Sequence, residues 1–323
     1  MVFHFVVNPA GASGRTGKQF AALQPMLDDS GEEIHVHQST RQKNIEAVCR
    51  EVLQETAGEE KVNLVIVGGD GTFNQAINAV DDFSRVRLGL VPAGSGNDLA
   101  RSLGLSDRPE EVLSGILKGE ERRTLDLCEV VYHNISDLQP VGRDRKDGDV
   151  RCFAVSCGIG YDAAICQGVE VSRFKPVLNR LHIGKLIYIF VAIRLIFSTK
   201  LADLEICTDG RTARYHRGLF AVCMNTQYEG GGFRFCPDAD ENDGLLDVCI
   251  SNPLHSKMVF FRAFPMAYSG AHVKLKDVFW MERGREVRLR ADRPLWVHTD
   301  GEVEGRSSDI TVRTGTGKIH LLM

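Results

Sequence analysis

Three glycine-rich loops carry the residues that are best suited to chemistry in this sequence. They read NPAGASGRTGK from residue 8, GGDGT from residue 68 and PAGSGNDLA from residue 92, and each follows an apolar run. Glycine lets backbone N–H groups approach phosphate oxygens without obstruction by a side chain. A carboxylate such as Asp70 would repel a bare phosphate, so it indicates either a divalent cation at this place or a residue that orients a donor. Together the loops predict a site for a nucleotide and a metal ion.

A second group of candidate residues lies near the C-terminus, in the sequence HTDGE from residue 298. If Asp300 and Glu302 alternate along an extended strand, both carboxylates point to the same side. A solvated turn is one alternative interpretation, and a metal site made of His298, Asp300 and Glu302 is another.

The elements that must position the glycine loops alternate regularly over the first 120 residues. Apolar runs predict strands at 2–7, 34–38, 62–67 and 87–91, and helical patterns predict helices at 15–28, 45–57 and 74–80, with short helices from 97 and from 109. Because the strands are continuous apolar runs, helices should cover both faces of a parallel, doubly wound α/β sheet. Ligands of such sheets bind beyond the carboxyl ends of the strands, which is where the loops fall.

Beyond residue 125 strands dominate, and their connections look like hairpins. Strands are predicted at 125–133, 151–157, 204–208, 218–225, 246–251, 286–290 and 309–312, and helices at 161–171, 185–197 and 256–269. This pattern predicts an antiparallel, sandwich-like arrangement. The predicted fold is therefore α/β in two domains, with a nucleotide-binding α/β domain at 1–125 and a β-rich domain at 126–323.

Composition narrows the class of protein. The chain has 323 residues, a net charge of −4 and 43% hydrophobic residues, which is ordinary for a globular protein and gives no bulk basicity for a nucleic-acid partner. Its nine cysteines form no CxxC pair, so we expect buried thiols in a reducing cytoplasm. The N-terminus lacks the features of a signal peptide and reads as a strand.

One segment, GKLIYIFVAIRLIFSTK at 184–200, is apolar enough to raise the question of a membrane. It is interrupted by Arg194 and is too short to span a bilayer, which takes about 20 residues. A buried helix is the favoured interpretation. The alternative is a helix near a membrane surface, because Arg180, Lys185, Arg194 and Lys200 are spaced along it.

The motifs together resemble the catalytic domain of the diacylglycerol kinase and sphingosine kinase family, above all its bacterial soluble lipid kinases. GGDGT is followed by Phe73 and Asn74, then by GLVPAGSGNDLAR, and PDADENDGLLDV and HTDGE come later in the order that the family shows. The resemblance implies that ATP and Mg²⁺ are used to transfer a γ-phosphate to a hydroxyl of a lipid alcohol such as diacylglycerol. It implies a reaction in the cleft between the two domains, the second of which binds the lipid.

The family's site residues carry over where the motifs match. Nucleotide-binding positions fall on Asn8, Pro9, Gly14, Thr40, Gly68, Gly69, Asp70, Gly71, Thr72, Asn74, Ser95 and Asn97. A structural magnesium in bacterial members implies metal ligands at Asp240, Asp243 and Leu245. The late acidic pair matches the general base, for which Glu302 is favoured, with Asp300 orienting it or the metal. Asp70 is the third catalytic carboxylate and is expected to act through magnesium.

Partners and alternatives follow from the same features. We expect a lipid substrate at a membrane surface, a cytoplasmic chain associated peripherally with the membrane, and neither a transmembrane segment nor nucleic acid; a homodimer stays open. One alternative function is NAD kinase, against which the PAGSGND loop speaks. Another is a nucleotide-responsive regulatory protein of the same fold without catalysis, against which the three acidic candidates speak.

Overall fold

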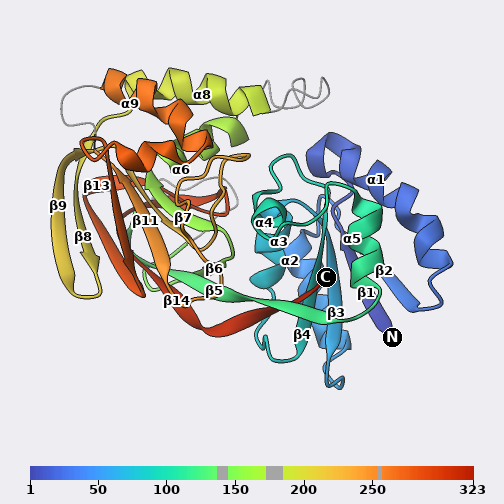
Figure 1. The fold of residues 1–323 in the computed structure, drawn as a ribbon. Helices are drawn as coiled ribbons and strands as arrows, with labels where there is room; N and C mark the ends of the chain where they lie inside the picture. The colour runs from blue at the N-terminus through green and yellow to red at the C-terminus, as the bar shows by residue number, and fades with distance from the viewer. Residues whose placement is uncertain (137–144, 172–184, 253–256) are drawn as a thin grey trace. The chain divides into compact units, whose positions relative to one another are not determined.

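The structure is a computed structural model that describes residues 1–136, 145–171, 185–252 and 257–323 (Figure 1). Two units make up the chain, one of Met1–Leu127 with Thr316–Met323 and the other of Cys128–Gly315. Arg180 and most of the predicted hairpin connection at 136–149 lie outside the described residues.

Unit 1 is built on a parallel sheet, as predicted. Its strands are β1 (Val2–Val7), β2 (Glu33–Gln38), β3 (Val62–Gly68) and β4 (Val86–Pro92), in the order β4-β3-β1-β2. Every residue of β3 is buried, which explains its almost entirely apolar sequence. The carboxyl ends of β1, β3 and β4 therefore lie at one edge of the sheet, and each is followed by a glycine-rich loop.

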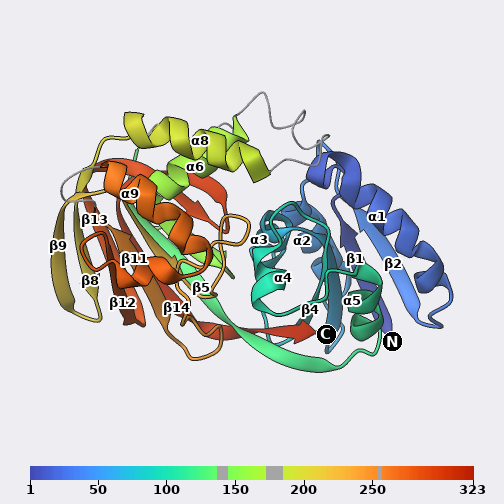
Figure 2. The same ribbon diagram turned by 45° about the horizontal axis from the view of Figure 1, so that its top comes forward.

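Helices pack against both faces of this sheet. They are α1 (Gly11–Asp28), α2 (Ile45–Glu55), α3 (Asp70–Ile77), α4 (Asp98–Ser102) and α5 (Pro109–Ile116). Phe3, Phe5 and Val7 of β1 share one hydrophobic cluster with α1 and α5. The alternate residues of β1 point to the other face, and α2 contacts both β1 and α3 (Figure 2). This is the doubly wound arrangement that the sequence predicts.

Helix α3 begins earlier than predicted. Its first residue is Asp70, whereas the sequence pattern placed the start at Asn74. Gly69 caps the helix in an extended conformation, and an acidic residue in the first turn is favourable at the positive end of a helix. Most of the GGDGT motif is thus the first turn of a helix and not a free loop.

Unit 2 is dominated by antiparallel strands, again as predicted. Its strands, of which β5 and β14 extend into unit 1, are β5 (Glu121–Ile135), β6 (Val150–Phe153), β7 (Ser156–Gly160), β8 (Ala202–Thr208), β9 (Arg211–Gly218), β10 (Phe220–Met224), β11 (Leu246–Ser251), β12 (Phe279–Gly284), β13 (Glu286–Thr299) and β14 (Glu302–Leu322). The central path runs β12-β11-β10-β7-β13-β14. Strands β9 and β12 were not predicted as separate strands. Polar residues dominate β9, which in the described part of the chain pairs only with β8.

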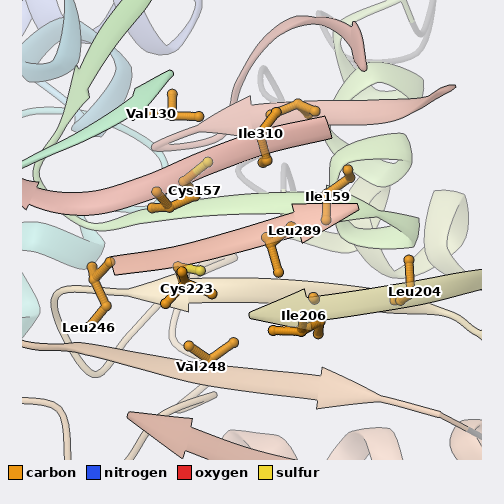
Figure 3. Close-up of a cluster of buried hydrophobic side chains, with 14 of the residues drawn as sticks. Val130, Cys157, Ile159, Leu204, Ile206, Cys223, Leu246, Val248, Leu289 and Ile310 are labelled. Atoms are coloured by element: carbon orange, nitrogen blue, oxygen red, sulfur yellow. The ribbon is translucent and has the colours of Figure 1, made fainter. Parts of the chain in front are cut away.

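Two hydrophobic clusters cover the two faces of the strands in unit 2. Figure 3 shows one, in which Cys157, Ile159 and Cys223 meet side chains of β8, β11, β13 and β14. Phe220, the residue that starts β10, belongs to the other cluster, with residues of α8 (Lys185–Ser198), α9 (Lys257–Ala263) and the 3₁₀ helix η1 (Phe264–Tyr268). Helix α6 (Tyr161–Glu170) and the 3₁₀ helix η2 (Ala271–Lys274) complete the described elements.

The end of the chain departs from the predicted domain boundary. Residues 316–323, predicted to belong to the second domain, are part of unit 1 because His320 and Leu321 of β14 pair in parallel with Arg87 and Leu88 of β4. The sequence around Gly315 and Gly317 is too rich in glycine and threonine for its apolar pattern to reveal so long a strand.

Among the described helices, α8 included, none is both long enough and apolar enough to cross a membrane.

Candidate nucleotide and phosphoryl-transfer site

The loops after β3 and β4 touch each other through glycine. A Cβ atom added to Gly94 would lie 2.4 Å from the Cα atom of Gly69, so neither position has room for a side chain. The amide of Ala93 donates to the carbonyl of Gly68 at 2.8 Å, and the amide of Gly94 donates to Asn97 Oδ1 at 2.9 Å. Glycine is therefore required here by close packing of the two backbones.

The side chain of Asp70 also connects the loops that follow β3 and β4. Its carboxylate oxygens accept hydrogen bonds from the amides of Asp98 and Leu99, each at 3.0 Å, at the start of α4. Burial raises the pKa of the Asp70 carboxyl group, and these two amide bonds oppose the rise. The sequence left two roles open for Asp70, binding of a divalent cation and orientation of hydrogen-bond donors. The geometry favours the second role, because the carboxylate oxygens are directed at backbone amides.

The loop after β1 is strained and is tied to the loop after β4. Ala12, Ser13 and Gly14 have φ values of 47°, 59° and 88°, a left-handed run that is costly for the first two residues. Thr16 donates through its hydroxyl to the carbonyl of Ala93 at 2.8 Å, and Arg15 donates to the carbonyl of Gly94 at 2.7 Å. Strain of this kind typically persists where the conformation serves a site.

A cavity opens beside the joined loops in unit 1. Its volume is about 470 Å³, and it is lined by Arg15, Lys18, Gln19, Pro92, Ala93, Gly94, Asn97 and Asp107. Arg15 and Lys18 are cationic and Asp107, between α4 and α5, is anionic, while the remaining residues come from the start of α1, the end of β4 and the loop after it. The cavity thus offers positive charge next to glycine-rich backbone, which suits an anionic ligand.

The remaining predicted nucleotide residues differ in how they are placed. Asn8 and Pro9 directly follow β1, and Ser95 is exposed in the loop after β4. The hydroxyl of Thr40 accepts the amides of Gln42 and Lys43 in its own turn, at 3.3 and 3.1 Å. Asn74 is fully buried within α3 and does not line the cavity.

The late acidic pair occupies a tight turn in unit 2, which corrects the expectation of an extended strand. Asp300 and Gly301 connect β13 to β14 with φ values of 50° and 80°, the positive pair that an Asp-Gly hairpin turn adopts. Asp300 is only 8% exposed, whereas Gly301 is exposed, so the turn is solvated only in part. Glu302 is the first residue of β14 and pairs with Thr299.

Asp300 is held by backbone amides. Its Oδ1 accepts from Val155 at 2.8 Å and from Ser156 at 3.0 Å, and its Oδ2 accepts from Ala154 at 3.0 Å. These bonds fix the connection between β6 and β7 against the turn. Asp300 therefore positions backbone, as Asp70 does in unit 1.

His298 does not join Asp300 and Glu302 in a metal site. Its Nε2 atom lies 3.1 Å from Asp162 Oδ2 and 3.0 Å from Glu229 Oε1, and its Nδ1 accepts the amide of Gly301 at 3.1 Å. Asp162 and Glu229 were not predicted as site residues; the signal that the sequence offers is the glycine-rich GIGYD motif, which ends in Asp162.

The predicted magnesium ligands surround a turn that is rich in carboxylates. Asp243 Oδ1 accepts the amide of Leu245 at 2.9 Å, and its other oxygen pairs with Arg283, which also contacts Asp247 Oδ2 at 3.2 Å. Asp240 accepts the amide of Asn242 at 3.0 Å. Burial raises the pKa of Asp247 to about 6, and nearby carboxylates add to the rise. More negative charge is gathered here than one arginine neutralises, which fits a bound cation.

Comparison with known proteins identifies the family. The diacylglycerol kinase catalytic domain matches residues 2–130, and the YegS C-terminal NAD kinase beta sandwich-like domain matches residues 155–322. The chain belongs to the bacterial diacylglycerol-kinase-like lipid kinases. The diacylglycerol kinase of Bacillus subtilis (strain 168) is 26% identical to this kinase over 301 residues, which cover 93% of this chain and 89% of that protein.

Further comparisons agree with this result. The diacylglycerol kinase of Mycobacterium tuberculosis (strain ATCC 25618 / H37Rv) is 26% identical over 240 residues, covering 74% of this chain and 70% of its own. A crystal structure of a diacylglycerol kinase from Bacillus anthracis str. Sterne has a TM-score of 0.62 and 16% identity, and the match covers 99% of this chain and 96% of that one. The fold of this lipid kinase is thus the family's fold.

Proposed function

We propose that this lipid kinase uses ATP and Mg²⁺ to phosphorylate a hydroxyl group of a lipid alcohol such as diacylglycerol. One observation carries the proposal: three glycine-rich loops, at the carboxyl ends of β1, β3 and β4, are tied together beside a cationic cavity in unit 1. The names of the relatives support a lipid acceptor.

The triphosphate of ATP is proposed to bind at these loops. Phosphoryl transfer passes through a loose transition state that needs alignment and neutralised charge more than covalent chemistry. Arg15 and Lys18 supply positive charge from α1, and the backbone around Gly69 and Gly94 leaves room for close approach. Asp70 acts here by holding the amides of α4 in place.

Magnesium is proposed to bind at the carboxylate-rich turn, through Asp243 and Asp240 with the backbone of Leu245. The surplus of negative charge around Arg283 supports this, because a cation that shared Asp243 with the arginine would reduce the repulsion among the carboxylates. When bound, the ion supplies positive charge to this part of unit 2.

Glu302 is proposed as the general base that accepts the proton of the lipid hydroxyl. Support comes from Asp300, whose oxygens already accept three backbone amides, so that the neighbouring carboxylate is the better candidate for proton transfer. Asp300 then fixes the turn from which Glu302 emerges.

Access to the lipid is proposed to run through an exposed apolar surface on unit 2, here named the α8–η1 surface. It consists of Ile193, Phe197, Met258, Val259 and Tyr268, each at least 42% exposed. Helix α8 contacts α9, and α9 contacts η1, so these residues come from adjoining elements. Exposed Arg194, Lys200 and Arg262 lie on the same elements or beside them, and such a mixture suits the surface of an anionic membrane. We therefore also propose a peripheral, cytoplasmic location.

A panel of acceptors tests the proposed function. Purified protein would be incubated with γ-labelled ATP and Mg²⁺, and with diacylglycerol, a sphingoid base, a prenol or a phospholipid in mixed micelles, with NAD as the non-lipid acceptor. We expect label in at least one lipid, none in NAD, and no transfer without Mg²⁺. Label in NAD would favour the NAD kinase alternative. ATP binding without transfer to any acceptor would favour the regulatory alternative.

A further inference from the structure

Unit 2 contains a buried cluster of two carboxylates and one histidine that the proposed reaction does not use. Asp162 belongs to the first turn of α6, Glu229 follows β10, and His298 lies in β13. One ligand atom from each of them lies within 4.8 Å of the other two. The side chain of His298 is fully buried, and those of Asp162 and Glu229 are 13% and 11% exposed.

The charges in this cluster do not balance. In the described part of the chain, the ion pairs of Asp162 and Glu229 are with His298 alone. Asp162 Oδ1 and Glu229 Oε2 are buried and accept no hydrogen bond from any described residue. Keeping two carboxylates away from water without a neighbouring cation is strongly unfavourable, so the site calls for a positive charge.

The histidine ring is poorly placed to supply that charge. Gly301 donates its amide to Nδ1, so the ring proton must lie on Nε2, between the two carboxylates. Protonation of Nδ1 would place two N–H groups face to face and break the contact with Gly301. A metal ion on Nε2 would require the same protonated Nδ1.

Space for the cluster is provided by a glycine. A Cβ atom added to Gly158 would lie 1.8 Å from Asp162 Oδ2 and 2.5 Å from His298 Nε2. Gly158 has no left-handed φ, so its backbone does not require glycine. The missing side chain is what allows the carboxylate and the ring to meet.

We propose that Asp162 and Glu229 bind a hard divalent cation, Mg²⁺ or Mn²⁺, through the buried oxygens Oδ1 and Oε2. Oxygen ligands suit such cations, and ligating carboxylates are typically held by further hydrogen bonds, the role that His298 Nε2–H has here. Because the same ring accepts the amide of Gly301, the cation would also stabilise the turn of Asp300 and Gly301. This site is separate from the magnesium site proposed at Asp243.

Mn²⁺ titration tests the site without any kinase assay. Protein freed of metal with EDTA, and without nucleotide, would be titrated with Mn²⁺ while free Mn²⁺ is followed by electron paramagnetic resonance. Wild type should bind one more Mn²⁺ ion than either Glu229→Gln or Asp162→Asn. The control Asp243→Asn should retain this ion, because it changes the other carboxylate turn. Circular dichroism would confirm that each variant is folded.

Thermal unfolding distinguishes a cation bound by Asp162 and Glu229 from a proton that the two carboxylates share. In EDTA, Glu229→Gln should melt at or above the temperature of wild type, because it removes uncompensated charge. Saturating Mn²⁺ should raise the Tm of wild type by more than that of Glu229→Gln. Equal Mn²⁺ stoichiometry and affinity in wild type and both carboxamide variants would overturn the proposal, as would a wild type that binds no Mn²⁺ at this site.

Discussion

Replacement of Gly94 by alanine tests whether the nucleotide site depends on contact between two backbones. The new Cβ atom would lie 2.4 Å from Gly69 Cα, 2.7 Å from Asn97 Oδ1 and 3.0 Å from Gly69 N, while ordinary contacts begin at 3.4 Å. Because the nearest atom is backbone, no side-chain rotation relieves the clash, and the loops must separate by about 1 Å.

Two effects of Gly94→Ala follow from that separation. Overpacking of this kind costs about 1–3 kcal/mol of unfolding free energy. A displacement of about 1 Å in a site that works by alignment can lower turnover by about a hundredfold. We therefore expect a lower unfolding free energy in urea, weaker binding of an ATP analogue by calorimetry, and a turnover that falls more than stability alone explains.

Gly58→Ala provides the matched control. A Cβ atom there meets nothing within 4 Å, and the backbone is not left-handed, so the same substitution should leave ATP binding unchanged. Its effect on stability should be neutral or a gain of up to about 1 kcal/mol. If Gly94→Ala matched Gly58→Ala in unfolding free energy and in affinity for the ATP analogue, the contact between the loops would have no role in the site.

Three further predictions concern unit 2. Asp300→Asn should lower the unfolding free energy by about 1–3 kcal/mol, because it disturbs the hydrogen bonds from three backbone amides. Glu302→Gln should leave stability unchanged and lower lipid phosphorylation by about 10²–10⁴-fold. Normal lipid phosphorylation by Glu302→Gln would exclude Glu302 as the base. Replacing Arg194 and Lys200 by glutamate should weaken binding to anionic vesicles, since each basic residue contributes about 1 kcal/mol near such a surface. Unchanged sedimentation with vesicles, or a change from dimer to monomer, would contradict a membrane role for the α8–η1 surface. Burial lowers the pKa of His272 to about 4. The stability that its neutral form contributes is therefore fully present above pH 6.5 and is lost as the pH falls from there through 4. Urea midpoints of His272→Gln should depend less on pH between 6.5 and 4 than those of wild type, and an unchanged pH dependence would refute this role of His272.

Much of the fold could be predicted because its signals are local. Mostly apolar runs identified β1, β3 and β4, and the glycine loops after these strands were expected at one edge of the sheet, where the structure has them. Strand β9 and the long C-terminal part of β14 were missed, because their sequences carry few apolar residues and their pairing is decided by distant strands. The cluster around His298 was missed for the same reason, since its members are far apart in the sequence.

The roles of the carboxylates could not be predicted from residue type alone. Asp70 and Asp300 both stand in motifs that invite a catalytic reading, yet each directs its oxygens at backbone amides of another segment, Leu99 in one case and Val155 in the other. A short acidic side chain beside glycine is well suited to this task, because it can satisfy amides that a loop leaves without partners. Such a carboxylate determines where the neighbouring groups lie. Substitution of either aspartate should therefore change stability and activity together, while a residue that only transfers a proton, as proposed for Glu302, should change activity alone.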